Sequence, residues 1–179
     1  MTEAIYGKPN AAVKITHNYN EWQSYDANGN ILDLKRNGIS DNPSNLIQID
    51  DLVYQYASNN SNLLVNVIDA TNNDAGFKKG NATQNNDFEY DANGNLIVDR
   101  NKNITAITYN HLNLPVKVTF DNASNKFIQY LYTATGQKVQ NLVRHLDSLS
   151  TTRYVSGFQY FDNMLQFFHT PEGYVKNTP

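Results

Sequence analysis

Cysteine is absent from this sequence of 179 residues, which excludes a disulfide framework, a thiolate metal site and a cysteine nucleophile. Charge is also scarce, because Asp, Glu, Lys and Arg make up only 17% of the chain. Fourteen Lys and Arg against seventeen Asp and Glu leave a formal net charge of −3. A chain with this balance is not drawn to phosphate backbones or anionic lipids, so we expect no nucleic-acid partner.

Long apolar runs are missing as well. No stretch approaches the ~18 apolar residues of a membrane span, and residues 1–9 lack the apolar core of a signal peptide. We therefore expect no membrane span in this segment, and we expect any export signal to lie outside it. Capped helical periods are also lacking; the best candidate, Asp50 to Tyr56, fits a strand equally well. The sequence predicts little or no helix.

The chain is instead rich in aromatic residues and asparagine. Hydrophobic residues make up 40% of it and aromatic residues 12%, enough for a folded domain rather than a solvated linker. Asparagine accounts for roughly one residue in six. Because asparagine suits tight turns and is a poor residue inside helices, this composition favours many short strands joined by turns.

A short motif repeats along the chain. The run YDANGNI at 25–31 recurs as YDANGNL at 90–96, and a looser copy, YTATGQKV, occupies 132–139. Physically, Asp-Ala-Asn-Gly predicts a hairpin turn in which the aspartate caps the turn and the glycine takes a positive φ beside a bulge. The predicted turn-defining residues are Asp26, Gly29, Asp91, Gly94 and Gly136.

Repeat spacing and alternation together predict an array of hairpins. Tyrosines at 90, 109, 132 and 154 lie 19, 23 and 22 residues apart, which leaves room for one hairpin per repeat. The clearest strand runs from Leu112 to Phe120 with apolar side chains at every second position, although Pro115 requires a solvent-facing side, a bulge or a strand that starts there. Similar alternation marks 127–132, 158–160 and 165–167. Between about residues 66 and 88 the pattern dissolves into a long turn-rich loop.

These letters resemble the YD repeats of the Rhs family of large bacterial surface and secreted proteins. The resemblance covers most of residues 25–175 and is strongest from Tyr90 to Pro115. Residues 154–160 and 168–174 resemble the passage just before that family's core domain. The resemblance implies a segment of a curved β-hairpin shell that can enclose a toxin. It carries over no catalytic residue, because the family's aspartate self-cleavage motif has no match after Tyr174.

No constellation of residues indicates catalysis, a cofactor or a metal. The Asp-x-Asn-x-Asn runs at 26–30 and 91–95 fail as calcium loops, because they lack the glycine at position six and the glutamate at position twelve. His17, His111, His145 and His169 are far apart and form no zinc-ligand pair, so surface or packing roles are favoured, with His111 on the polar face of its strand. The sequence offers one possible ligand platform, formed by Tyr19, Trp22 and Tyr25.

The sequence therefore predicts an all-β, non-catalytic structural segment built from a curved antiparallel sheet of tandem hairpins. Strands in 1–24 would lead into the array at 25–175, followed by a tail at 176–179. Its expected partners are neighbouring repeats and a core domain of the parent chain, or a second copy through exposed sheet edges. The expected location is the cell surface or outside the cell. The alternative is a surface module that binds glycans or proteins through the aromatic platform and the 66–88 loop.

Overall fold

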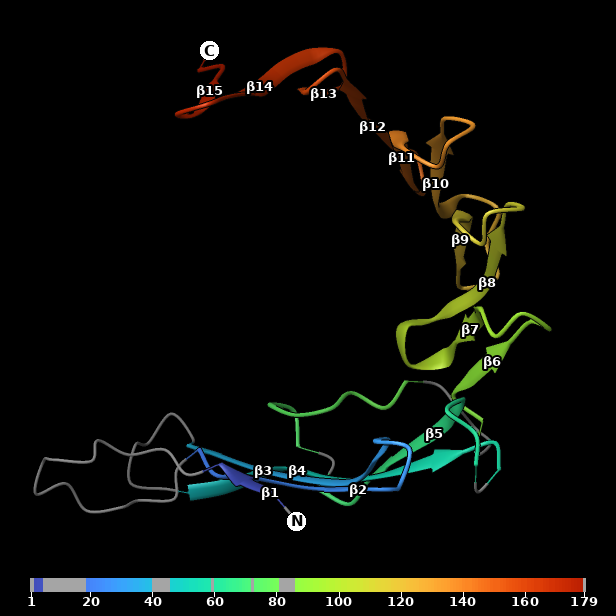
Figure 1. Ribbon diagram of the computed structural model, residues 1–179, viewed down its shortest axis with the longest axis vertical. Helices are drawn as coiled ribbons and strands as arrows, with labels where there is room; N and C mark the ends of the chain where they lie inside the picture. Colours follow the sequence, from blue (N-terminus) through green and yellow to red (C-terminus); the bar gives the residue numbers. More distant parts are fainter. Residues whose placement is uncertain are drawn as a thin grey trace, which may run out of the picture. The chain divides into compact units, whose positions relative to one another are not determined.

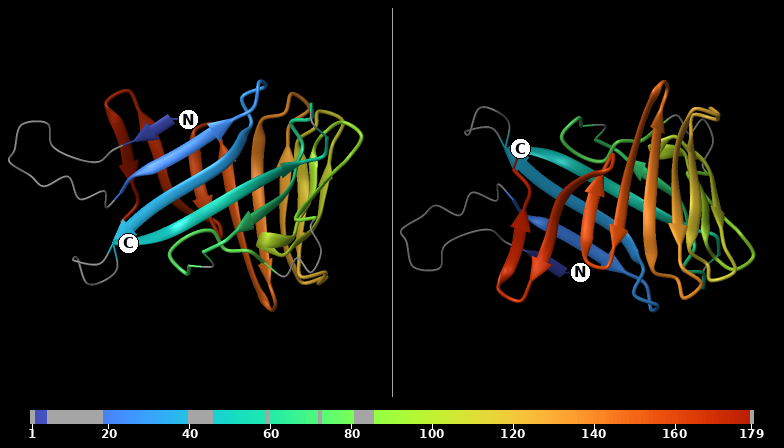
Figure 2. Two further views of the ribbon diagram at one scale, coloured as in Figure 1. Left: turned by 90° about the horizontal axis from the view of Figure 1, so that it is seen from below. Right: turned by 90° about the horizontal axis from the view of Figure 1, so that it is seen from above.

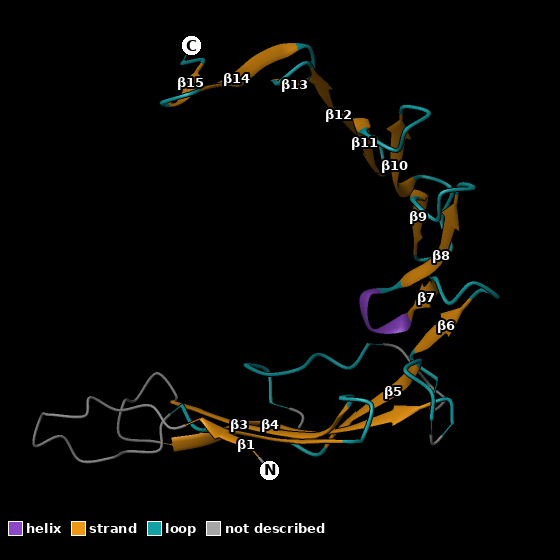
Figure 3. Cartoon of the chain, viewed as in Figure 1, coloured by secondary structure: helices purple, strands orange, loops and turns teal. Residues whose placement is uncertain are grey.

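Antiparallel β-strands make up nearly all of the regular structure, so the chain is all-β as predicted. The computed structural model describes residues 2–4, 19–39, 46–58, 60–71, 73–80 and 86–178. One short 3₁₀ turn, η1 (Arg100–Lys102), is the only helical element in that part of the chain, and Figure 3 shows it among the strands. The chain divides after Tyr90 into two units. The predicted array from 25 to 175 therefore spans both.

The first unit contains a five-stranded sheet in which every strand pairs with its neighbour in sequence (Figure 1). All pairings in it are antiparallel. Its strands are β1 (Thr2–Ala4), β2 (Glu21–Tyr25), β3 (Ile31–Ile39), β4 (Leu46–Tyr56) and β5 (Leu64–Asp69), and the unit ends with β6 (Phe88–Tyr90). The segment Asp50 to Tyr56, which fitted either a helix or a strand, is part of β4.

The second unit continues the same pattern of sequential antiparallel pairing. Figure 2 shows its strands lying side by side as a ribbon sheet. Its strands are β7 (Leu96–Asp99), β8 (Ile104–Tyr109), β9 (Pro115–Phe120), β10 (Lys126–Tyr132), β11 (Lys138–His145), β12 (Ser148–Val155), β13 (Phe158–Phe161), β14 (Met164–Thr170) and β15 (Gly173–Lys176). The strands predicted at 127–132, 158–160 and 165–167 are thereby confirmed.

Two sequence predictions need correction. The strand predicted from Leu112 begins only at Pro115, because residues 110–114 form a turn whose backbone bonds close on themselves. Proline starts the strand since it has no N–H to give to the ladder. The loop predicted from residue 66 begins only after Asp69, because Asn66 to Asp69 pair with β4. Strand pairing overrides the high asparagine and aspartate content there.

Among the described residues, the buried apolar core is small and lies in the first unit. Leu52 and Val67 are 5% and 2% exposed and share one face of the β4–β5 pair, which the segment after β5 covers. In the second unit, Asp99 is the only fully buried residue among the described residues 91–178. The strands from β7 to β14 keep half-buried residues, whereas all four residues of β15 are exposed. Half-burial against the side chains of adjacent strands is expected for a single-layer sheet.

Candidate functional site

The repeated turn is the first feature that could carry function. In the turn at 91–95 the Asp91 carboxylate accepts hydrogen bonds from the backbone N–H of Asn93 and of Asn95, both at 2.9 Å, and from the Asn95 side chain at 2.9 Å. Gly94 closes the turn with a φ of 82° and donates its N–H to the Asp91 carbonyl. The turn at 26–30 has the same bonds around Asp26, with Gly29 at a φ of 86°.

These bonds determine the electrostatics of the two aspartates. The hydrogen bond from the Asn95 side chain, followed by the backbone bonds, lowers the pKa of Asp91 below its usual value of 3.8. Asn30 lowers the pKa of Asp26 in the same way. The carboxylate oxygens are occupied by the turn itself. Among the described residues, no three or more His, Cys, Asp or Glu side chains are grouped so that they could hold a metal ion.

Two further turns share this geometry, and only the one at 133–137 is predicted from the sequence. At 133–137 the Thr133 hydroxyl replaces the carboxylate and accepts from the backbone N–H of Gln137, while Gly136 has a φ of 87°. At 110–114 Asn110 accepts from two backbone N–H groups, and Asn113, at a φ of 56°, takes the place of glycine. Asparagine tolerates this left-handed conformation, so a Tyr-Asn pair three residues before a second asparagine was the available signal.

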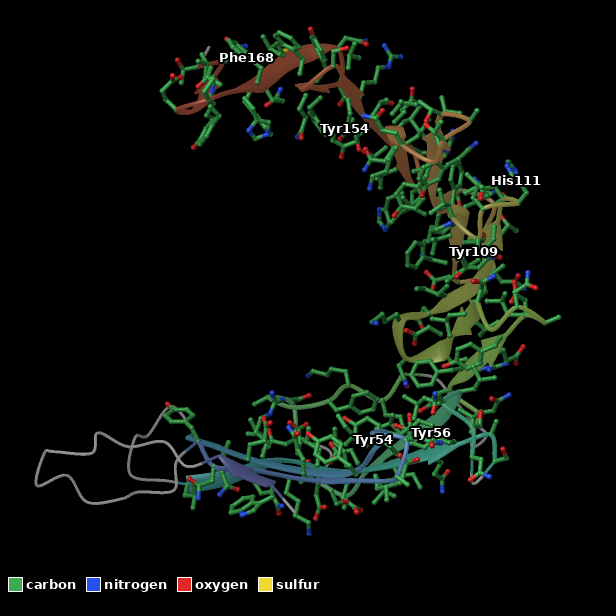
Figure 4. All side chains as sticks on the ribbon, viewed as in Figure 1. Tyr54, Tyr56, Tyr109, His111, Tyr154 and Phe168 are labelled. Carbon is green, nitrogen blue, oxygen red and sulfur yellow. The ribbon has the colours of Figure 1, made fainter. Side chains whose placement is uncertain are left out.

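A tyrosine precedes each of these turns, and Tyr56 likewise precedes a turn in which the Ala57 N–H donates to the Leu63 carbonyl. The Tyr25 hydroxyl donates to Gln23, whereas the other four hydroxyls bond to the preceding repeat. Each of these hydroxyls donates to the carbonyl of the residue that begins the strand after the preceding turn, at 2.6 to 3.0 Å. Burial raises the pKa of three of these tyrosines, Tyr56, Tyr109 and Tyr132, above 10.0. Figure 4 labels Tyr56 and Tyr109. The four bonds are Tyr56 to Ile31, Tyr90 to Leu64, Tyr109 to Leu96 and Tyr132 to Pro115.

The pattern changes at the fourth predicted tyrosine. Tyr154 lies in β12 and is followed by a two-residue turn at Ser156 and Gly157, with φ values of 48° and 88°. Such a turn joins two strands directly and needs no bulge. The regular spacing of the tyrosines in the sequence therefore extends to Tyr154, although the turn that follows Tyr154 is of a different type.

The predicted aromatic platform is only partly brought together. Trp22 lines a hollow of about 630 Å³ on the first sheet, whose other lining residues come from β2, β3 and β4. Neither Tyr19 nor Tyr25 is among the described residues that line it, although both are about half exposed. The remaining lining residues are Gln23, Ser24, Asp33, Lys35, Asn37, Leu46 and Gln48. This set combines one indole ring with hydroxyl, amide, carboxylate and ammonium groups.

A buried polar cluster on the first unit was not predicted at all. Asp50 is fully buried, forms an ion pair with Arg36 at 2.5 Å and accepts the Phe77 N–H at 2.6 Å. Gly76 packs so tightly here that a Cβ atom would collide with the Ile49 carbonyl and the Asp50 carboxylate. These contacts hold the segment after β5 against β4. Figure 1 shows the course of this segment along the first sheet. No local sequence pattern links residues 27 positions apart.

The second half of this cluster surrounds Asp87, which is also fully buried. Its Oδ2 accepts the Val67 N–H at 2.9 Å, and its Oδ1 lies 3.8 Å from Lys79 Nζ. Lys79 Nζ also donates to Asn66 Oδ1 at 3.1 Å and to the Val67 carbonyl at 3.0 Å. The cluster thus brings an amine, a side-chain amide and a carboxylate together beside β5.

The histidines are placed apart from these features. His111 is exposed in the 110–114 turn, not on a strand, and Figure 4 shows it pointing away from the sheet. His145 is exposed at the end of β11, and His169 packs edge-on against Phe167 with ring centroids 5.4 Å apart. His17 lies outside the described residues. Within the described segments, no helix has the length and apolar character needed to cross a membrane.

Comparisons with known proteins add no relatives to this picture: no protein-family model matches the chain, and no curated protein matches it.

Proposed function

We propose that this chain is a structural segment of a large exported YD-repeat protein, in which it forms part of a β-shell that scaffolds or encloses a downstream domain. The observation that carries the proposal is the tyrosine hydroxyl bond between one repeat and the next, which occurs at four junctions. These bonds join neighbours only, so the free energy of the array is a sum over junctions and an array of this kind can extend without a closed core.

The chemistry of the described residues supports a non-catalytic role. The carboxylates of Asp26 and Asp91 are used by their turns, and Asp50 is neutralised by Arg36. A single-layer sheet also has two faces that can form the inner and outer surfaces of a shell. The resemblance of residues 25–175 to YD repeats supports the same proposal.

The test is protease protection in the parent protein. The native reading frame around this segment would be expressed whole, and the downstream domain would be followed by immunoblot during limited proteolysis. The shell proposal expects protection that is lost when Tyr109 and Tyr132 are both changed to Phe, and retained when the exposed Tyr174 is changed to Phe. A downstream domain cut equally fast in all three proteins would contradict the proposal.

The hollow beside Trp22 favours a second candidate function, a surface module that binds a glycan. An indole ring can stack on the apolar face of a sugar, and the adjacent Asp33, Asn37 and Gln48 can bond its hydroxyls. Binding to a glycan array that is lost in Trp22→Ala, with unchanged circular dichroism, would support it. Silence across a broad array would contradict it. Tyr25→Ala is the matched control, because Tyr25 is exposed but does not line the hollow.

A further inference from the structure

The cluster of Lys79, Asn66 and Asp87 contains a side-chain amide in addition to the ion pair between Lys79 and Asp87. The segment after β5 turns back along the sheet in Figure 1 and carries Lys79 to β5. There the amine lies 3.1 Å from the carbonyl oxygen of the Asn66 side chain. A primary amine held against a carboxamide is the reactant pair of an amide-forming reaction, in which nitrogen attacks the carbonyl carbon.

The surroundings of Asn66 hold its side chain in one orientation. Asn66 is fully buried, and its Nδ2 donates to Gln55 Oε1 at 2.8 Å. That bond directs the carbonyl side of the amide towards Lys79. The Lys79 side chain is 29% exposed, so solvent reaches part of this side chain. A fixed carbonyl beside a fixed amine avoids the entropy cost of bringing two groups together.

Asp87 supplies the group that such a reaction requires for proton transfer. Its carboxylate is fully buried, with Oδ2 held by the Val67 N–H at 2.9 Å. Its Oδ1 is buried without a hydrogen bond and lies 3.8 Å from Lys79 Nζ. A buried acceptor is normally hydrogen-bonded, so a carboxylate oxygen left open towards an amine is an unusual arrangement.

We propose that Lys79 and Asn66 join through an intramolecular isopeptide bond, with Asp87 as the proton-transfer residue. Asp87 Oδ1 takes a proton from the Lys79 ammonium, and the neutral amine attacks Asn66 Cγ to form a new C–N bond. Asp87 then gives this proton to Nδ2, the bond between Cγ and Nδ2 breaks, and ammonia is released. Asp87, ionised again, takes the surplus proton from the nitrogen of the new amide and passes it to the ammonia, which leaves as ammonium. The reaction is redox-neutral, needs no cofactor, and makes no use of the proposed shell function.

Intact mass spectrometry of the whole chain tests this proposal directly. The cross-linked protein should be lighter than the sequence mass by about 17 Da, the mass of the lost ammonia. Trypsin should fail to cut after Lys79, because its amine is no longer free. The new bond should also keep fragment 79–100 covalently joined to fragment 37–78. A purified protein that keeps its full sequence mass after prolonged incubation would overturn the proposal.

Matched variants separate this bond from other losses of ammonia. Lys79→Arg keeps the positive charge but removes the nucleophilic amine, and it should restore the full mass. Lys78→Arg, next to it in sequence, changes a lysine paired with Asp74 and should leave the mass loss intact. Asp87→Asn should slow or abolish the loss. Succinimide formation at the exposed Asn28-Gly29 and Asn93-Gly94 pairs also releases ammonia, so a loss that persists in Lys79→Arg would contradict the cross-link.

Discussion

Single residues determine where the chain reverses. Gly29, Gly94 and Gly136 all have φ values between 82° and 87° in turns of one geometry, and Asn113 serves at the fourth with a φ of 56°. Only glycine enters this region without cost, and asparagine enters it with little. The first residue of each turn contributes a side-chain oxygen that accepts backbone N–H groups. An oxygen acceptor and a left-handed residue three positions later are therefore the local code of the array.

Gly94→Val should lower the free energy of unfolding by more than about 1 kcal/mol, because a β-branched residue is strained at positive φ. Gly94→Asn is the matched control, since asparagine already occupies this place at Asn113, and it should cost less. Chemical denaturation followed by circular dichroism measures both. Equal losses in the two variants would argue against strain as the cause.

Because of Asp26 and Asp91, which cap the two turns, the stability of the fold should depend on pH in the acid range. The pKa of Asp91 is lower in the folded chain than its usual 3.8, so the folded state binds fewer protons than the unfolded state near that value. The stabilisation is present above the usual pKa and is lost as pH falls through the folded value. Asp91→Asn, which copies Asn110, should stay folded at neutral pH and show a shallower loss of stability in acid.

That comparison is made by denaturant titrations between pH 2 and 7, with Asp147→Asn in an exposed turn as the control. If the stability of Asp91→Asn falls in acid as steeply as that of the unmodified chain, Asp91 is not the source of the pH dependence.

Elements are held to one another at their tyrosine junctions. The Tyr109 hydroxyl donates to the Leu96 carbonyl at 2.6 Å and so ties the end of β8 to the start of β7. Asparagine side chains at the turn tips add further bonds between neighbouring turns, such as that from Asn95 to Asn113 at 2.9 Å. Each junction thus joins two hairpins at their turns, beyond the ladder bonds within the sheet.

Tyr109→Phe should cost about 1 kcal/mol, the usual net value of an intramolecular hydrogen bond. Its effect should also depend on alkaline pH. Burial raises the pKa of Tyr109, so the folded state holds the phenolic proton longer, and this stabilisation is lost as pH rises from about 10 through the folded pKa. The variant should lose stability less steeply than the unmodified chain over that range. Tyr174→Phe, 66% exposed, should change neither quantity.

At the scale of the whole molecule, the feature that determines association is the exposed apolar surface of the strands near β15. All four residues of β15 are exposed, and within the described chain only β14 pairs with it. Large apolar residues are also exposed on β12, β13 and β14, including Leu149, Val155 and Met164. A strand with an open edge and apolar side chains is a template for pairing with another chain.

The isolated chain should therefore associate as its concentration rises. Multi-angle light scattering should give a weight-average mass that grows above that of the monomer, 20.3 kDa. Val175→Lys places a charge on the edge strand and should shift the association to higher concentration. A monomer at every concentration, in both proteins, would contradict edge pairing.

The sequence predicted the parts of this fold that depend on neighbouring residues. The YDANGN runs indicated turns at Asp26 and Asp91, and alternation indicated strands such as β10. It missed the turn at Asn110, because Leu112 and Leu114 extend the alternation of β9 and no glycine marks the reversal. The cluster of Asp50, Asp87 and Lys79 could not be foreseen, because it depends on how a turn-rich segment folds back onto a sheet, which local patterns do not encode.

The junction tyrosines have a consequence for how such a chain can change in length. Deleting residues 91–109 would place Tyr90 directly before Asn110, so that a tyrosine again stands in front of a complete turn. Duplicating the same segment would insert one more hairpin and one more tyrosine junction. Growth and shortening by whole units therefore preserve every remaining contact of this kind, and we expect chains that differ by whole repeats to fold.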